Sequence, residues 1–190
     1  MGDRREELAH AATDHVLDHG LIGMSLRPLA AAIGTSDRML LYHFRDKADL
    51  LSTVLRVSND RSVRGIRELA PSPDLRQAVL DLWGVLSTPE QARCLRLYVE
   101  AAALGVLGAE PYASVVSEAN EVWLQALAHH LGGSGLPPGP ARRAARLVEA
   151  ALMGLQLDEP LEDPDDVRRS VADLADAVAA LWGDAAAGRG

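Results

Sequence analysis

Three dipeptides constrain this chain most strongly: Ser72-Pro73, Thr88-Pro89 and Asp163-Pro164. Each places a side-chain acceptor at an N-cap position and a proline at the first helical position, where the missing N–H costs nothing. Thr88 is also followed three residues later by Gln91, which completes a capping box. Each dipeptide therefore predicts the start of a helix.

Helical periodicity runs through almost the whole chain, and no segment alternates apolar and polar residues as a strand does. Gly20 and Gly34 are placed to end two helices, and Ser25 and Asp46 are placed to cap two others. A segment rich in Gly and Pro at 132–140 predicts a loop. The fold class is therefore all-α, with about nine helices expected over residues 4–19, 26–33, 36–44, 47–69, 73–86, 89–107, 111–131, 140–157 and 164–182.

Composition allows a folded core and gives no sign of a membrane span. The 190 residues are 48% hydrophobic, enough for one domain or for a small domain joined to a larger one. The N-terminus lacks the apolar run of a secretory signal, and no stretch approaches the roughly 18 apolar residues of a membrane helix. The single cysteine, Cys94, is expected as a buried apolar residue in a reducing compartment. We therefore expect a cytoplasmic protein.

The net charge of −8 argues against a chain coated with cations for nucleic acid, but the charge is distributed unevenly. Residues 27–47 hold four cations and two acids, so this segment is locally positive. It includes Lys47, the only lysine in the sequence. The segment is therefore the candidate for a contact with nucleic acid.

The first three expected helices form a small unit with the order helix, glycine-containing turn, helix, which is the arrangement of a helix-turn-helix. In that motif the second helix of the pair enters the major groove of DNA. At about 100° per residue, Leu40 and Phe44 share one face of the helix at 36–44. Together with Ile33 and Leu50 they can close a small core.

The opposite face of this helix carries Arg38 and Tyr42, flanked by Met39 and Leu41. Arginine can bond a guanine through two hydrogen bonds, and an apolar side chain can contact a thymine methyl group. Tyrosine, histidine and lysine can bond phosphate oxygens. The same residues allow a second interpretation, in which Met39 and Leu41 are buried against another helix and Arg38 is merely solvated.

Residues 29–51, LAAAIGTSDRMLLYHFRDKADLL, resemble the DNA-binding domain of the TetR family of bacterial transcriptional regulators. The match covers about the first 50 residues and is specific as a set, whereas the rest of the chain is similar only in the number and length of its helices. The resemblance implies a DNA-binding domain at 1–50 and a domain at 51–190 that binds a small ligand and forms a dimer. The residues that match the family's pattern are Gly20, Ser25, Leu29, Ala30, Gly34, Ser36, Leu40, His43, Phe44, Lys47 and Leu50.

Two positions depart from the family's pattern. Arg38 stands where the family often has a small residue, and Leu41 stands where it usually has a tyrosine that contacts phosphate. Either Tyr42 takes over that contact or Leu41 meets a base or sugar. The resemblance also places Arg27 where the second helix can reach DNA, although a solvated arginine fits that position equally well. The candidate DNA contacts are Arg27, Ser36, Asp37, Arg38, Met39, Leu41, Tyr42, His43 and Lys47.

The last two long helices carry broad apolar stripes that are rich in alanine, which allows helices to approach closely. Two such helices from each of two chains would form a four-helix interface with two-fold symmetry. The alternative is that both stripes cover the core of a single chain. The predicted interface residues are Leu147, Val148, Ala151, Leu152, Leu155, Val171, Leu174, Val178 and Leu181.

A ligand pocket is expected among the helices from 73 to 157, because pockets between helices are mostly apolar with a few placed polar groups. Plain core packing explains each candidate as well. The adjacent His129 and His130 point about 100° apart on a helix, which is poor for joint metal ligation and fits a polar or cationic helix C-terminus. The candidate walls and anchors of the pocket are Trp83, Tyr98, Glu100, Asn120, Trp123 and Met153, with Glu121 as a further polar group.

The sequence contains no nucleophile elbow, phosphate loop, cysteine pair or HExxH motif, so no enzyme, metal site or cofactor is expected. We predict a homodimeric transcriptional regulator, most simply a repressor. It binds a pseudo-palindromic operator in double-stranded DNA through residues 25–47 and releases it when a small molecule binds. The alternative is a helical ligand-binding or interaction protein that has lost specific DNA binding. The acidic net charge and the residues at 38 and 41 motivate that alternative.

Overall fold

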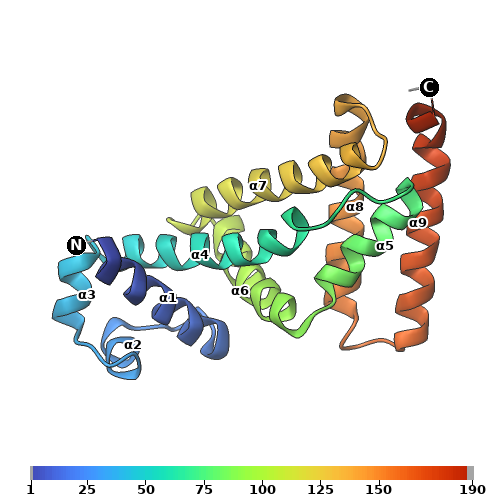
Figure 1. Cartoon of the computed structure of the whole chain (residues 1–190). Helices are drawn as coiled ribbons and strands as arrows, with labels where there is room; N and C mark the ends of the chain where they lie inside the picture. The colour runs from blue at the N-terminus through green and yellow to red at the C-terminus, as the bar shows by residue number, and fades with distance from the viewer. Residues whose placement is uncertain (1, 188–190) are drawn as a thin grey trace. The chain divides into compact units, whose positions relative to one another are not determined.

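The computed structural model describes the backbone of residues 2–187 and the side chains of residues 4–183. Within residues 2–187 there are nine helices and no strand, which confirms the all-α prediction (Figure 1). The helices are α1 (Gly2–His19), α2 (Leu26–Ala32), α3 (Asp37–His43), α4 (Lys47–Arg67), α5 (Leu75–Leu86), α6 (Pro89–Val106), α7 (Tyr112–Gly133), α8 (Pro138–Asp158) and α9 (Pro164–Ala187).

Several predicted helix starts carry the side-chain cap that the sequence indicates. At α4, Asp46 Oδ1 accepts the backbone N–H of Asp49 at 2.8 Å. At α6, Thr88 Oγ1 accepts the N–H of Gln91 at 3.4 Å. Before α9, Asp163 Oδ1 accepts the N–H of Asp165 at 2.8 Å. These acceptors satisfy N–H groups that the first turn of a helix leaves without an internal partner.

The start of α5 differs from the prediction. The N-cap is Asp74 and not Ser72, because Asp74 Oδ1 accepts the N–H of Gln77 at 2.7 Å and the helix begins at Leu75. The hydroxyl of Ser72 instead donates to Asp81 Oδ2 at 2.5 Å. Asp74 therefore supplies the capping acceptor for α5, and Ser72 is used in another hydrogen bond.

The predicted loop at 132–140 is much shorter in the structure. Helix α7 continues to Gly133 and α8 begins at Pro138, so residues 134–137 alone join them. Pro138 takes the first helical position of α8, where proline is tolerated. Gly135 has φ +119, a conformation that favours glycine, and it makes the short connection possible.

The chain divides into two compact units. Unit 1 comprises residues 1–62 and 93–120, and unit 2 comprises residues 63–92 and 121–190. Helices α4, α6 and α7 therefore each contribute residues to both units. Among the described residues, no helix is both long and apolar enough to cross a membrane.

Unit 1 contains α1, α2 and α3 around a single apolar cluster. In Figure 1 these three helices lie together near the N-terminus, beside the first half of α4. The buried cluster draws on α1, α2, α3, α4, α6 and α7, and it includes Cys94 as the sequence predicts. The long helices thus fix α2 and α3, which have seven residues each and are too short to be stable alone.

Unit 2 is built around α5, α8 and α9. Helix α9 packs against both α5 and α8, and the three run side by side in Figure 1. The apolar stripe of α5 lies in the core of this unit, with Ala78, Val79 and Leu82 fully buried. The closeness of the helices follows from the many alanines on α8 and α9, because small side chains let helix axes approach.

Candidate nucleic-acid interface

Helix α3 has an inward face that closes the small core predicted from the sequence. Leu40 is fully buried and Phe44, directly after the helix, is 1% exposed. Leu50 of α4 lies in the same buried cluster, and Ile33 packs against it partly buried. The prediction that Leu40 and Phe44 point inward is confirmed.

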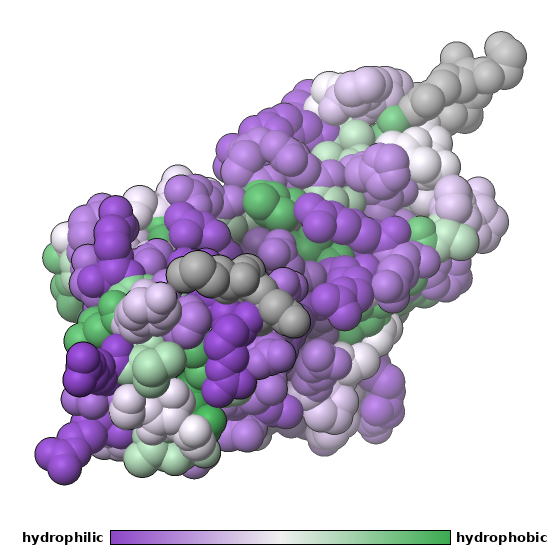
Figure 2. All heavy atoms as spheres, turned by 60° about the vertical axis from the view of Figure 1, so that its left-hand side comes forward, coloured by the Kyte–Doolittle hydropathy of each residue, from purple (hydrophilic) through white to green (hydrophobic). Residues whose placement is uncertain are grey.

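The outward face of α3 is accessible to a partner. Tyr42 is 67% exposed, Leu41 47% and Met39 43%, and Arg38 is also exposed. In Figure 2 the molecule is rotated so that the left-hand side of Figure 1, where α3 lies, faces the reader. This face shows small apolar areas among polar surface. The interpretation that Met39 and Leu41 are buried against another helix of this chain is therefore wrong.

The first turn of α3 is held by its own polar side chains. Ser36 Oγ accepts the N–H of Met39 at 3.2 Å, and Asp37 Oδ1 accepts the N–H of Arg38 at 2.9 Å. The Ser36 hydroxyl still has a proton to donate to an outside acceptor. Asp37 has no proton to donate when ionised, so its geometry supports a role in stabilising the start of α3, where negative charge is favourable.

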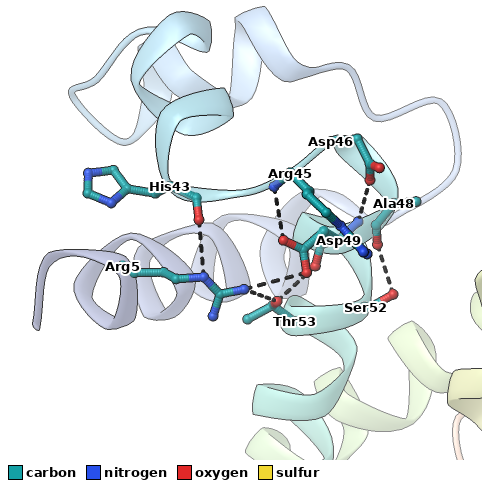
Figure 3. A network of polar contacts seen from close by, with 8 residues as sticks. All are labelled: Arg5, His43, Arg45, Asp46, Ala48, Asp49, Ser52 and Thr53. Carbon is teal, nitrogen blue, oxygen red and sulfur yellow. Dashed lines mark hydrogen bonds and ion pairs between the residues drawn. The ribbon is translucent and has the colours of Figure 1, made fainter. Parts of the chain in front are cut away.

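The last turn of α3 is braced by Arg5 of α1, a residue that the sequence did not single out (Figure 3). Arg5 Nε donates to the backbone carbonyl of His43 at 3.1 Å. Its Nη2 lies 3.5 Å from Asp49 Oδ1 and 3.4 Å from Thr53 Oγ1, both on α4. The guanidinium also lies 4.7 Å from the centre of the Phe44 ring, within the range of a cation–π contact. One side chain therefore ties α1, α3 and α4 together.

Asp49 joins this brace to the turn between α3 and α4. Its second carboxylate oxygen, Oδ2, accepts the backbone N–H of Arg45 at 3.0 Å, as Figure 3 shows. Asp46 and Asp49 thus bond backbone groups on both sides of the start of α4. These two hydrogen bonds hold the backbone of the turn between α3 and α4.

Two predicted DNA contacts lie beside α3. The exposed Lys47 donates from Nζ to the carbonyl oxygen of Met24 at 2.5 Å, so it holds the turn that precedes α2. Two ammonium protons remain for other acceptors. Arg27 is exposed in the first turn of α2. Ser25 occupies the N-cap position of α2, but its side chain makes no capping hydrogen bond.

The predicted ligand residues are divided between the two units. Tyr98, Glu100 and Asn120 belong to unit 1, and the Tyr98 hydroxyl donates to Asn120 Oδ1 at 2.9 Å. The carboxylate of Glu100 accepts the N–H groups of Leu21 and Ile22, so it is already occupied within the protein.

The other predicted ligand residues lie in unit 2. Trp83 and Trp123 pack, partly buried, against its core, and Met153 is also partly buried. Glu121 pairs with Arg142 through two contacts of 3.0 Å. A surface hollow of about 540 Å³ lies between the end of α7 and the start of α8, and none of the predicted ligand residues lines it.

The predicted dimer residues fall into two groups. Val148, Leu152, Val171 and Val178 are buried within the monomer, as in the alternative that the stripes cover one chain's own core. Leu181 is 65% exposed and Leu147 43%, so both can meet a partner. Ala151, Leu155 and Leu174 are partly buried.

His130 is part of a buried polar group, not a cationic helix end. It is 4% exposed, and burial lowers the pKa of its imidazole below 6.5. Its Nε2 lies 3.5 Å from the hydroxyl of Ser72, which bonds Asp81. The hydrogen bond from Ser72 also lowers the pKa of the Asp81 carboxyl. His129, by contrast, is exposed.

Solved structures share this fold. A protein from Rhodococcus sp., assigned to the TetR family of transcriptional regulators, matches with a TM-score of 0.74 and 22% identity over 94% of this chain and 99% of its own. A transcriptional regulator from Streptomyces coelicolor A3(2) matches with a TM-score of 0.67 and 27% identity over 90% and 98%. A regulator from Saccharomonospora viridis, solved in complex with choline, has a TM-score of 0.68 and 19% identity over 93% and 95%.

No protein-family model matches the sequence, and no curated protein matches it either. The structural likeness nevertheless spans nearly the whole length of each chain. The chain therefore has the fold of TetR-family transcriptional regulators, and the resemblance noted in its first 50 residues is confirmed at the level of fold.

Proposed function

We propose that this chain is a DNA-binding transcriptional regulator, and specifically a cytoplasmic repressor that acts as a homodimer. The observation that carries the proposal is the division of α3 into two faces. Leu40 is fully buried while Tyr42 on the opposite face is 67% exposed. A short helix with one face packed in the core and the opposite face exposed to solvent suits insertion into the major groove.

The outward residues have distinct roles in this proposal. Arg38 reads a base, since its guanidinium can bond a guanine bidentately, and Met39 and Leu41 contact thymine methyl groups or sugars. Tyr42, His43 and Lys47 bond phosphates. The exposure of Tyr42 supports it as the replacement for the tyrosine that the family has at the position of Leu41.

The remaining contacts contribute less to sequence reading. Ser36 can donate its hydroxyl proton to a phosphate while it caps α3. Arg27, exposed at the start of α2, adds positive charge near the backbone of the DNA. Asp37 lies at the interface as an acid in the first turn of α3, where it accepts the Arg38 N–H, and not as a donor.

The functional division is proposed at residue 50. Residues 1–50 bind DNA, and residues 51–190 bind the effector and form the dimer. Leu147 and Leu181 are the interface residues that exposure supports best. Two-fold symmetry would place two copies of α3 about one turn of DNA apart, which matches a pseudo-palindromic operator.

The effector is proposed to be a small molecule that binds in the helical body. One structural neighbour was solved with choline, which shows that this fold can hold a small organic ligand in that protein. A ligand that prefers one spacing of the two α3 helices shifts the population of dimers toward it. Release of the operator follows when the preferred spacing does not fit DNA.

The salt dependence of DNA binding tests this proposal. A fluorescent pool of randomised 30-base-pair duplexes is titrated with protein at several salt concentrations, and binding is followed by anisotropy. A regulator that neutralises several phosphates loses affinity steeply as salt rises, with a slope of about −0.9 per phosphate contacted. A helical ligand-binding protein that has lost DNA binding would show no such titration, and that result would contradict the proposal.

A further inference from the structure

We infer that Glu100 of α6 is a positioning residue for the DNA-binding helices. Its carboxylate fixes the turn between α1 and α2, and through that turn it sets the placement of α2 and α3. The part of this inference that concerns DNA rests on the proposed function. The part that concerns the turn stands on the geometry of unit 1 alone.

The carboxylate of Glu100 accepts two successive backbone N–H groups. Its Oε2 lies 2.6 Å from the nitrogen of Leu21 and 2.9 Å from that of Ile22. Both residues follow the end of α1, where backbone N–H groups need an acceptor from outside the helix. A carboxylate that accepts backbone N–H groups forms charge-assisted bonds, which are about twice as strong as neutral ones.

Gly20, at the end of α1, leaves room for the Glu100 carboxylate to approach the turn closely. It closes α1 by donating its N–H to the Val16 carbonyl at 2.8 Å, and its φ of +86 is one that other residues rarely adopt. A Cβ at this position would lie 3.0 Å from Glu100 Oε1. A larger residue would therefore both strain the turn and push the carboxylate away.

The same turn is also held from its other end. The carbonyl of Met24 accepts the ammonium group of Lys47, at the first residue of α4, at 2.5 Å. The N–H of Met24 bonds the Leu21 carbonyl at 3.1 Å, so the two ends of the turn are joined. A continuous series of hydrogen bonds thus runs from α6 through the turn to the start of α4.

Helix α6 is itself fixed in unit 1 around Glu100. Leu97, three residues before Glu100, and Ala101, the residue after it, lie in the same buried cluster as Leu21. Nearer its start, Arg93 pairs with Asp18 of α1 at 2.7 Å. Glu100 therefore projects from a helix that is itself held in place. A shift of α6 must either move the turn with it or break the two hydrogen bonds from Leu21 and Ile22 to Glu100.

The turn leads directly into the DNA-binding pair. Helix α2 begins at Leu26, two residues after Met24, and α2 packs against α3. A change at Glu100 therefore reaches α3 through the turn, although Glu100 itself is not a proposed DNA contact. Helix α6 belongs to the proposed effector-binding body. Through Glu100 and the turn, it is therefore connected to α3.

The first test follows backbone amides by NMR in the free, full-length protein. Glu100→Ala should accelerate hydrogen exchange at Leu21 and Ile22 by roughly tenfold or more, because their acceptor is lost. It should also shift the amide resonances of α3. Glu100→Gln keeps a neutral acceptor and should give a smaller change in the same direction.

Glu118→Gln is the matched control. It removes one negative charge from the same unit, but Glu118 bonds the side chain of Arg56 at 3.0 Å and no backbone group of the turn. It should leave the Leu21, Ile22 and α3 amides unchanged. Unaltered exchange at Leu21 and Ile22 in Glu100→Ala, or unaltered α3 resonances, would overturn the inference whether or not the protein binds DNA.

The second test uses the sign of the effect on DNA affinity, measured with the randomised duplex pool. Both Glu100→Gln and Glu118→Gln make the net charge less negative, so electrostatics alone would tighten binding in both. Positioning predicts instead that Glu100→Gln weakens binding severalfold and Glu100→Ala roughly tenfold, with the salt slope unchanged because no phosphate contact is lost. Equal tightening by both glutamine variants would contradict a positioning role.

The two proposals fail in different ways. If the wild-type protein binds no duplex, the proposed function fails, and the exchange experiment still decides the role of Glu100 in the free protein. If the wild-type protein binds DNA and Glu100→Ala binds with unchanged affinity, the inference fails and the proposed function stands.

Discussion

Arg5 Nε, on the first turns of α1, donates a hydrogen bond to the backbone carbonyl of His43, the last residue of α3, at 3.1 Å. A helix of seven residues cannot hold its own geometry, so its last carbonyls need partners from outside. The Arg5 guanidinium supplies one and carries the ion pair with Asp49 at the same time. The orientation of α3 is thus set partly by a residue 38 positions earlier in the chain.

Replacing Arg5 with methionine should destabilise unit 1. Methionine keeps most of the apolar stem but removes the donors to His43, Asp49 and Thr53, and we expect a loss of about 1–2 kcal/mol in the free energy of unfolding. Urea denaturation followed by circular dichroism measures it. Arg4→Met is the control, since the exposed Arg4 pairs with nearby Glu7 among the described residues and should change stability by less than about 0.5 kcal/mol. Equal losses of stability in both variants would show that the contacts of Arg5 with α3 and α4 do not stabilise unit 1.

Lys47→Met should weaken binding to every duplex alike. The ammonium group has protons left for a phosphate after its bond to Met24, and losing one phosphate contact lowers the salt slope by about 0.9. Anisotropy titrations at several salt concentrations measure both quantities. A lower affinity with an unchanged slope would mean that Lys47 acts only through the turn.

Stability should fall as the pH drops below 6.5 because of His130. Burial lowers the pKa of His130 in the folded state, so the unfolded chain binds its proton first. The stabilisation is complete above 6.5 and is lost as the pH falls from there toward the folded-state pKa. Asp81, whose pKa is lowered by its bond from Ser72, adds a loss in the same direction below its usual 3.8.

Urea denaturation between pH 7.5 and 5 measures this effect. His130→Gln should reduce the pH dependence in that range and leave the part that belongs to His15, whose pKa burial also lowers. His129→Gln, a change at the neighbouring exposed residue, should keep the full dependence. A wild-type stability that is constant over the range would show that His130 is protonated equally in the folded and unfolded chains.

The wild-type protein should be a dimer at micromolar concentration, and Leu147→Arg should make it a monomer. Leu147 is 43% exposed on α8, so arginine fits the single chain but places a charge in the proposed interface. Light scattering gives the mass of each species. Leu107→Arg, at an 82% exposed position in unit 1, should stay dimeric. A dimer that survives Leu147→Arg would place the interface elsewhere.

Local rules predicted much of this fold, since each depends on a few neighbouring residues. Helical spacing placed Leu40 inward and Tyr42 outward, and the exposure of both residues agrees. The capping acceptors Thr88 and Asp163 marked real helix starts. These features need no knowledge of distant contacts, so the sequence is sufficient for them.

Long-range polar contacts explain what the sequence could not show. Glu100 resembled a ligand anchor because its partners, Leu21 and Ile22, lie almost 80 residues earlier and are backbone groups without a sequence signature. Ser72 resembled a cap, but its hydroxyl bonds Asp81 nine residues later. The contacts of Arg5 could likewise not be predicted, because the sequence pattern around one arginine among many does not indicate which distant residues it bonds.

Selection of bound duplexes from a randomised pool tests the central claim most directly. The proposed regulator should enrich a pseudo-palindromic sequence whose half-sites lie about 10 base pairs apart. Arg38→Ala should relax the preference at one position in each half-site, at a cost of about 1–3 kcal/mol. A pool that shows no enriched sequence after repeated rounds with the wild-type protein would contradict the account.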